Sequence, residues 1–147
     1  MKKLSKLLIA IVAAICVTPT ASAAYEYQGI WYNIENGNAV VCSNDEKYSG
    51  NIVIPENVVL DGKGYVVTAI GQAAFMSCTG LTSITLPNSV TTIGGGAFYF
   101  CTGLTSANIG NSVTTIGSSA FYNCTALTSA NIGNSVITID NWAFYNC

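Results

Sequence analysis

Residues 81–101 read LTSITLPNSVTTIGGGAFYFC, and closely related copies follow at residues 104–124 and 127–147, each shifted by 23 positions. Two columns of residues keep this step along the whole second half of the chain, one of phenylalanines and one of cysteines: Phe75, Phe98, Phe121 and Phe144, and Cys78, Cys101, Cys124 and Cys147. An internal period of roughly 20–50 residues is typical of a solenoid, in which each repeat forms one coil and stacks on the next. The units are therefore 74–96, 97–119 and 120–142, followed by a partial unit 143–147.

The composition of each unit favours short strands and turns over helices. Proline or glycine stands at the middle of each unit, at Pro87, Gly110 and Gly133, and Thr, Val and Ile are frequent. Proline and glycine destabilise helices, whereas β-branched residues fit the pleated surface of a strand. The stretch Leu-Thr-Ser-Ile-Thr-Leu and its variants place apolar side chains inward and small polar ones outward. The outward residues predicted in this way are Thr82, Ser83, Thr85, Thr105, Ser106, Asn108, Thr128, Ser129 and Asn131.

The segment Ala-Phe-x-x-Cys is expected to form a single helical turn that inserts its phenylalanine into the coil. The predicted fold is a mainly β repeat solenoid, a right-handed superhelix of short parallel strands with single helical turns. One coil buries too little apolar surface to offset the entropy of ordering its own backbone. Several coils must therefore fold together, with a cap at each open end.

Residues 24–73 are predicted to form a β-hairpin N-terminal cap that contains a degenerate first coil. Two hairpin signals, Asn36-Gly37 and Asp61-Gly62, each lie between short apolar runs. The run 52–55 (IVIP) matches 84–87 (ITLP), and 67–71 (VTAIG) matches 90–94 (VTTIG). The cap is thus expected to continue the coil pattern, interrupted by a hairpin.

Residues 1–23 have the three parts of a cleavable signal peptide. Lys2, Lys3 and Lys6 form a basic start, residues 7–17 are apolar, and residues 21–23 (ASA) form a small-residue cleavage site. The apolar run is too short to span a bilayer, and no later stretch has the apolar length of a membrane helix. Cys16 allows lipoprotein processing as an alternative, although Ile15 stands where a small residue is required. We therefore expect an exported protein, secreted or held at the cell surface.

The charge pattern argues against a nucleic-acid partner. The chain has 5 Lys and Arg, 7 Asp and Glu and no His, and no charged residue lies between Gly64 and Ile139. A basic footprint is absent, and a surface of Thr, Ser and Asn suits hydrogen bonding at close range.

At the C-terminal end of the sequence, Cys147 falls in mid-unit, which suggests either part of a longer array or an apolar edge covered by a partner or a second copy.

The pattern from Leu81 to Cys101, Leu-x-x-Ile-x-Leu-Pro-x-x-Val-x-x-Ile-x-x-x-Ala-Phe-x-x-Cys, closely resembles the BspA-like (Treponema pallidum type) leucine-rich repeats. The resemblance covers residues 67–147 and is carried by four in-register Ala-Phe-x-x-Cys copies. It implies a leucine-rich-repeat solenoid and a surface or secreted protein of host-associated microbes, some of them adhesins. The chain departs from the pattern where Ala107 and Ala130 replace Ile84, and where Gly110 and Gly133 replace Pro87.

The cysteine column has three interpretations. Equivalent residues of stacked coils lie about 5 Å apart, within the Cα range of a disulfide, and export permits oxidation. Parallel side chains point the same way, however, and cysteine is often buried as a free thiol. Buried thiols are the favoured reading, with bridges or a metal site as alternatives. The 23-residue spacing of these cysteines and the absence of His are unlike a zinc motif, and no cofactor is expected.

The aromatic residues admit a structural and a binding interpretation. Tyr99, Tyr122 and Tyr145 follow the repeated phenylalanines, and four further aromatic residues gather in the cap: Tyr25, Tyr27, Trp31 and Tyr32. They could act as binding residues, although packing over turns and hairpins is the simpler explanation. The outward Thr, Ser and Asn residues likewise form either a binding face or only a polar exterior.

The sequence predicts no enzyme. A Ser or Cys nucleophile would lack its usual base because the chain has no His. The leading hypothesis is a leucine-rich-repeat protein that binds an extracellular protein or cell-surface ligand through its uncharged strand face. Two alternatives are a structural unit that self-associates end to end, and a Thr-lined surface for ice or glycans.

Overall fold

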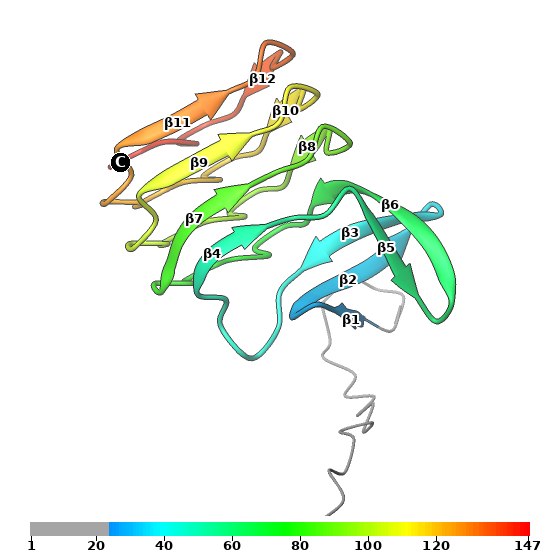
Figure 1. The fold of residues 1–147 in the computed structure, drawn as a ribbon. Helices are drawn as coiled ribbons and strands as arrows, with labels where there is room; N and C mark the ends of the chain where they lie inside the picture. The colour runs from blue at the N-terminus through cyan, green and yellow to red at the C-terminus, as the bar shows by residue number, and fades with distance from the viewer. Residues whose placement is uncertain (1–23) are drawn as a thin grey trace, which may run out of the picture.

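The computed structural model describes residues 24–147, which form an elongated stack of coils with a cap at the N-terminal end (Figure 1). The predicted signal peptide lies outside the described residues. Twelve strands and no helix occur in the described part of the chain. The strands are β1 (Tyr25–Tyr27), β2 (Ile30–Glu35), β3 (Asn38–Cys42), β4 (Gly50–Val53), β5 (Asn57–Leu60), β6 (Lys63–Ile70), β7 (Leu81–Thr85), β8 (Thr92–Ile93), β9 (Ser106–Ile109), β10 (Thr115–Ile116), β11 (Ser129–Ile132) and β12 (Thr138–Ile139).

Each coil contributes one strand to each of two parallel ladders. One ladder has the order β4-β7-β9-β11, and the other runs β6-β8-β10-β12 (Figure 1). Within the ladders, Ser83 pairs with Ser106, and Ile93 pairs with Ile116, so neighbouring coils are in register with the sequence repeat. The predicted β solenoid of short parallel strands is confirmed.

The Ala-Phe-x-x-Cys segment forms turns, so the expectation of a single helical turn is wrong. Residues 72–77, 95–100, 118–123 and 141–146 are turns without a helix. Phe75 donates its backbone N–H to Ala97 O at 2.7 Å, and Ser77 donates to Tyr99 O at 2.7 Å, both in the next coil. A helix would satisfy these groups internally and leave no bond to the neighbouring coil. The turn segments therefore form a third ladder between coils.

The repeated phenylalanines fill the interior of the stack, as the sequence predicted. Phe75, Phe98 and Phe121 are fully buried. Their rings stack at centroid distances of 5.0 Å between Phe75 and Phe98 and 4.8 Å between Phe98 and Phe121. Leu81, Ile84 and Leu86 of β7 and its following turn point into the same core. Burial of aromatic and aliphatic side chains on both sides of each coil explains why coils stabilise one another.

The cap extends one ladder beyond the other. Strand β3 pairs parallel with β6, and β2 and β1 follow it, so this sheet runs three strands past the first coil. Asn36-Gly37 joins β2 to β3 and Asp61-Gly62 joins β5 to β6, with positive φ at all four residues, which confirms both predicted hairpins. The predicted alignment of the first coil is also confirmed, because Ile52 pairs with Ile84 and Ile70 with Ile93.

The last coil differs from the coils before it in the burial of its apolar residues. Ile132 and Ile139 are 37% and 52% exposed, whereas the equivalent Ile109 and Ile116 are 1% and 0% exposed. Ala130 is exposed as well, while its equivalent Ala107 is buried. The difference arises because each described coil is covered on its C-terminal side by the next one, and this coil has only residues 141–147 above it.

Candidate functional site

The outward residues of β7, β9, β11 and the loops that enter β9 and β11 form a continuous uncharged surface, which we call the strand face. It consists of the nine residues predicted from the sequence, arranged in three columns along the stack: Thr82, Thr105 and Thr128; Ser83, Ser106 and Ser129; Thr85, Asn108 and Asn131. Six are exposed, and Ser83, Thr85 and Ser106 are half-buried. The structure therefore brings all nine together on one side of the ladder β4-β7-β9-β11.

The threonine column is held in one orientation by hydrogen bonds to the preceding coil. Thr105 Oγ1 donates to Thr82 O at 3.0 Å, and Thr128 Oγ1 donates to Thr105 O at 3.1 Å. In the third column Asn131 Nδ2 donates to Asn108 Oδ1 at 3.2 Å. Because these donors are used within the face, the threonine hydroxyls offer mainly acceptor lone pairs to a ligand. The side chains are thus ordered before any ligand arrives.

Asn51 belongs to this surface, although the sequence reading did not include it. Its Oδ1 accepts hydrogen bonds from Thr82 Oγ1 at 2.7 Å and Ser83 Oγ at 2.9 Å. A register irregularity between Gly50 and Asn51 in the pairing of β4 with β7 accompanies this arrangement. The alignment of residues 52–55 with 84–87 correctly placed β4 in the first coil. It could not reveal the role of Asn51, because a register irregularity leaves no periodic pattern in the sequence.

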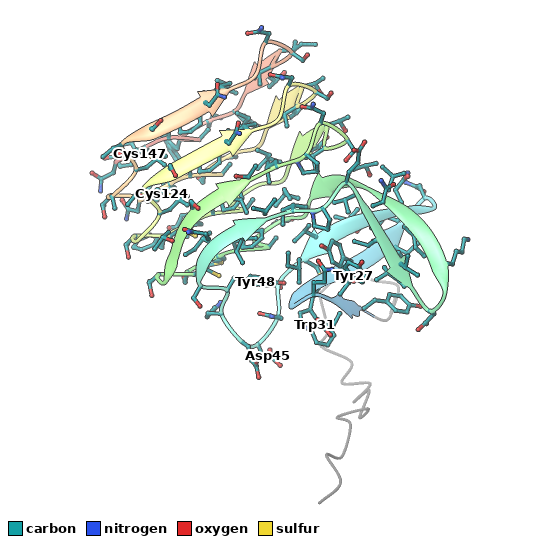
Figure 2. The ribbon with its side chains drawn as sticks, in the orientation of Figure 1. Tyr27, Trp31, Asp45, Tyr48, Cys124 and Cys147 are labelled. Carbon is teal, nitrogen blue, oxygen red and sulfur yellow. The ribbon has the colours of Figure 1, made fainter. Side chains whose placement is uncertain are left out.

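The cysteine column lies beside the phenylalanine stack. Cys78, Cys101 and Cys124 are buried free thiols, and Cys147 is an exposed free thiol after the last turn. Figure 2 labels Cys124 and Cys147. Cys101 Sγ donates to Phe75 O at 2.9 Å, and Cys124 Sγ donates to Phe98 O at 3.2 Å. The thiols of Cys101 and Cys124 therefore bond to the backbone of the preceding coil.

Burial makes the inner thiols weak acids. Desolvation, with a smaller contribution from neighbouring thiols, raises the pKa of Cys101 and of Cys124 to about 12 from the ordinary 9.0. Since the thiolate is the nucleophilic form, these groups are unsuited to covalent chemistry near neutral pH. The column acts in packing and in hydrogen bonding between coils.

The aromatic residues of the cap divide into packed and surface groups (Figure 2). Tyr32 is fully buried, and Tyr48, which the sequence reading did not single out, is buried against the ring of Phe75 at 4.7 Å. Tyr48 Oη donates to Cys42 O at 2.8 Å and accepts the N–H of Trp31 at 3.1 Å. Tyr25, Tyr27 and Trp31 are half-buried. Tyr48 thus links the loop 43–49 to the sheet and covers the end of the phenylalanine stack.

Comparison with protein families identifies the repeat. The model of the BspA type leucine-rich repeat region matches residues 50–147, in six copies. The match begins at the first residue of β4, where the structure has its first coil. This chain belongs to the BspA-type leucine-rich repeat family.

Solved structures of the same type support this assignment. A leucine-rich cell surface protein of Faecalibacterium prausnitzii A2-165 is 32% identical with a TM-score of 0.77, and the match covers 89% of this chain and 35% of that one. A leucine-rich repeat protein of Bacteroides capillosus ATCC 29799 is 32% identical with a TM-score of 0.74, covering 81% of this chain and 91% of that one. The leucine-rich repeat protein of T. pallidum, 22% identical with a TM-score of 0.55, shares the fold. No curated protein sequence matches the chain significantly.

One departure from the BspA-type pattern has a structural reason. A Cβ atom on Gly110 would lie 2.6 Å from Pro87 O, and one on Gly133 would lie 2.6 Å from Gly110 O. Side chains at these positions would force the coils apart. Glycine in the later BspA-type units therefore permits a close approach to the carbonyl oxygen of the coil below.

Residues 24–147 lack the features of two other kinds of site. No group of three or more His, Cys, Asp or Glu residues is arranged to hold a metal ion in this range. The same residues contain no helix with the length and hydrophobicity needed to cross a membrane. The strand face is an ordered polar surface of this BspA-type repeat array.

Proposed function

We propose that this BspA-type chain is exported by the signal peptide of residues 1–23 and binds an extracellular protein or cell-surface ligand through its strand face. A secreted or surface location agrees with the relative from Faecalibacterium prausnitzii, which is described as a cell surface protein. That relative is far longer than this chain, which spans 35% of it. Adhesion to a host protein or a neighbouring cell is the role that we infer.

The observation that carries this proposal is the order of the strand face. The side chains of Thr105, Thr128 and Asn131 are fixed by hydrogen bonds between coils before a partner binds. A surface ordered in this way loses little conformational entropy on association. The face also lacks charge, so its contacts would be short-range hydrogen bonds and flat packing rather than steering by long-range fields.

A binding role fits this chain better than catalysis. The sequence has no His, and the inner thiols are buried and bonded to backbone carbonyls. A nucleic-acid partner fits poorly, because the coils carry no Lys or Arg between Gly64 and Ile139. We infer a protein-binding or surface-ligand module.

The test compares the protein with a variant that carries one lysine in each of three coils, Thr82→Lys, Asn108→Lys and Ser129→Lys. These positions lie in different columns, so no two lysines are in register. A matched control places the same charge on exposed positions outside the strand face, Thr91→Lys, Asn111→Lys and Thr138→Lys. Binding to immobilised collagen, fibronectin and laminin is measured by surface plasmon resonance. Loss of binding in the first variant only supports the proposal, and equal binding by both variants contradicts it.

End-to-end self-association is the second candidate function. Its surface would be the edge of the last described coil, where Ile132 and Ile139 are 37% and 52% exposed among the described residues 24–147. A second copy that covers this edge would bury them and pair the open backbone of β11 and β12. Light scattering over a range of concentrations tests this candidate. A mass that stays at the monomer value at high concentration contradicts it.

A further inference from the structure

A second surface, separate from the strand face, lies on the turn ladder. Five aromatic residues of the turns 95–100 and 118–123 and 141–146 make up what we call the aromatic strip: Tyr99, Phe100, Tyr122, Trp142 and Tyr145. Tyr99 and Tyr122 stack with ring centroids 5.0 Å apart, and Tyr122 and Tyr145 with centroids 5.1 Å apart. The strip therefore follows the axis of the solenoid with one tyrosine in each of these three turns, whereas the turn 72–77 has Met76 at the equivalent position.

Phe100 and Trp142 stand at positions where the backbone disfavours bulky residues. Their φ angles are 58° and 57°, in the left-handed region. The equivalent positions in other coils hold smaller or more tolerant residues: Ser77, Asn123 and Asn146 for Phe100, and Ala73, Gly96 and Ser119 for Trp142. Left-handed backbone is unfavourable for residues with a bulky side chain, and Gly and Asn tolerate it best. The fold alone would thus favour Asn or Gly at both places.

Core packing does not account for these two aromatic residues. Phe100 is 37% exposed, and Trp142, which lies in the last described turn with no described coil above it, is 68% exposed. The ring of Phe100 packs against the ring of Tyr99, with centroids 4.7 Å apart and an angle of 45° between the planes. Phe100 therefore belongs to the strip and not to the core. Exposed aromatic residues that gather on one surface of a protein mark an interaction site.

Polar groups run beside the rings. Asn146 Nδ2 donates to Asn123 Oδ1 at 2.6 Å, which forms an amide ladder on the same turns. Each tyrosine of the strip also carries a phenolic hydroxyl, which both donates and accepts hydrogen bonds. The strip thus combines apolar ring surface with neutral hydrogen-bonding groups, a tyrosine hydroxyl in each of three turns and an asparagine amide in two of them.

The charge and the repeat of the strip indicate the class of ligand. No charged residue belongs to the strip, and the one nearest in sequence is Asp140. A polyanion would find a single cation, Lys47, whose Nζ donates to Met76 O at 2.9 Å in the preceding turn, and a polycation would find no line of carboxylates. A ligand that repeats one neutral unit at a spacing near 5 Å would meet a tyrosine in each of the three turns. An extended β-linked polysaccharide has such a repeat and presents apolar C–H faces flanked by hydroxyl groups.

We propose that the aromatic strip binds a neutral extended polysaccharide, whose sugar units lie along the solenoid axis. The sugar C–H faces pack on the exposed rings of Phe100 and Trp142, and sugar hydroxyls bond to the tyrosine hydroxyls and the Asn123–Asn146 amides. Protein binding by the strand face is a separate activity on a separate surface. The two proposals can therefore fail independently.

The test uses a double variant that introduces residues the chain already has at equivalent positions, Phe100→Asn as in Asn123 and Trp142→Ser as in Ser119. Both substitutions remove an exposed ring and suit the left-handed backbone, so the variant should fold with an unchanged or higher Tm. The control variant carries Thr91→Asn and Thr138→Ser, which are exposed and outside the strip. Retardation is measured in native gels that contain hydroxyethyl cellulose, glucomannan or the anionic polygalacturonate, and affinity by calorimetry with cellohexaose.

The expected result is retardation of the wild-type and control proteins by a neutral polysaccharide but not by polygalacturonate. The double variant should lose retardation and bind cellohexaose about tenfold more weakly or worse, as expected for the loss of two aromatic contacts. Absence of retardation in both neutral gels would overturn the proposal, as would equal retardation of the double variant. If the double variant instead loses binding to immobilised matrix proteins while no polysaccharide binds, the strip is a protein-docking surface and the proposal is wrong.

Discussion

The thiol of Cys101 donates a hydrogen bond to the carbonyl oxygen of Phe75, 2.9 Å away in the preceding coil. Cys147 repeats this contact with Phe121 at 3.1 Å, two coils later. Because successive cysteines point the same way along the stack, each thiol meets a backbone oxygen of its neighbour and not another sulfur. The column thus adds a side-chain bond between coils to the three backbone ladders.

Thiol reactivity should separate Cys147 from the inner members of the column. Cys147 is exposed, whereas Cys78, Cys101 and Cys124 are buried. With a chromogenic disulfide reagent at pH 8, one of these four thiols is expected to react rapidly in the native protein. Cys147→Ser should remove this fast phase, and all ladder thiols of the parent should react in denaturant without reductant. A thiol count in denaturant that rises only after reduction would instead indicate disulfides.

Alkaline pH is expected to destabilise the protein through the inner thiols. Burial raises the pKa of Cys101 and Cys124 to about 12, whereas an unfolded cysteine titrates near 9.0. Between these values the native state binds more protons than the unfolded state, so the free energy of unfolding falls as pH rises. The stabilisation is complete below pH 9, and the loss approaches about 1.4 kcal/mol per pH unit for each thiol.

Urea denaturation between pH 8 and pH 11 measures this effect. The double variant Cys101→Ala and Cys124→Ala should show a shallower decline in the free energy of unfolding than the parent. Burial also raises the pKa of Tyr32 and Tyr48, so some decline above pH 10 should remain in the variant. Equal slopes for the two proteins would show that the thiols do not cause the decline.

Removal of one ring from the middle of the phenylalanine stack should be strongly destabilising. Phe98 is fully buried between Phe75 and Phe121. Phe98→Ala leaves a cavity and is expected to lower the free energy of unfolding by about 3–5 kcal/mol in chemical denaturation. Phe144→Ala is the matched control, because Phe144 is half-buried and stacks on Phe121 alone within the described residues. A similar loss in both variants would argue against the stack as the source of stability.

The close approach at Gly110 can be tested with a single methyl group. Gly110→Ala places a Cβ 2.6 Å from Pro87 O, and the required separation of the coils should cost about 1–3 kcal/mol. Gly95→Ala is the control, since its Cβ would meet its nearest neighbour, Ser118 O, at an ordinary 3.5 Å. The midpoint of thermal unfolding should fall for Gly110→Ala and stay nearly unchanged for Gly95→Ala. Equal midpoints would show that the coils adjust without strain.

A further coil should stabilise the coils already present. If a copy of residues 125–147 is appended after Cys147, it continues the period and should cover Ile132 and Ile139, which are 37% and 52% exposed. Burial of these side chains and new pairing with β11 and β12 are expected to raise Tm and slow unfolding. Differential scanning calorimetry of the two proteins measures the change. A lower Tm for the longer protein would contradict the nearest-neighbour account of its stability.

The periodic side-chain pattern determined the coil and its interior. The 23-residue step predicted which coils are neighbours, and therefore the register of Ser83 with Ser106 and the burial of the phenylalanine column. The hairpins at Asn36-Gly37 and Asp61-Gly62 were also predictable, because a two-residue turn with positive φ is a local requirement. Side-chain chemistry and local backbone preferences can both be inferred from the amino-acid sequence.

The tertiary structure determined which backbone N–H and C=O groups pair by hydrogen bonds. Phe75 and Ser77 donate to Ala97 and Tyr99 in the next coil, which is why the Ala-Phe-x-x-Cys segment forms turns and no helix. The position of Asn51 beneath Thr82, and the extension of the β6 ladder by β3, likewise depend on segments distant in sequence. Every backbone has the same donors and acceptors, so their pairing follows from which coils and hairpins the packed side chains bring together.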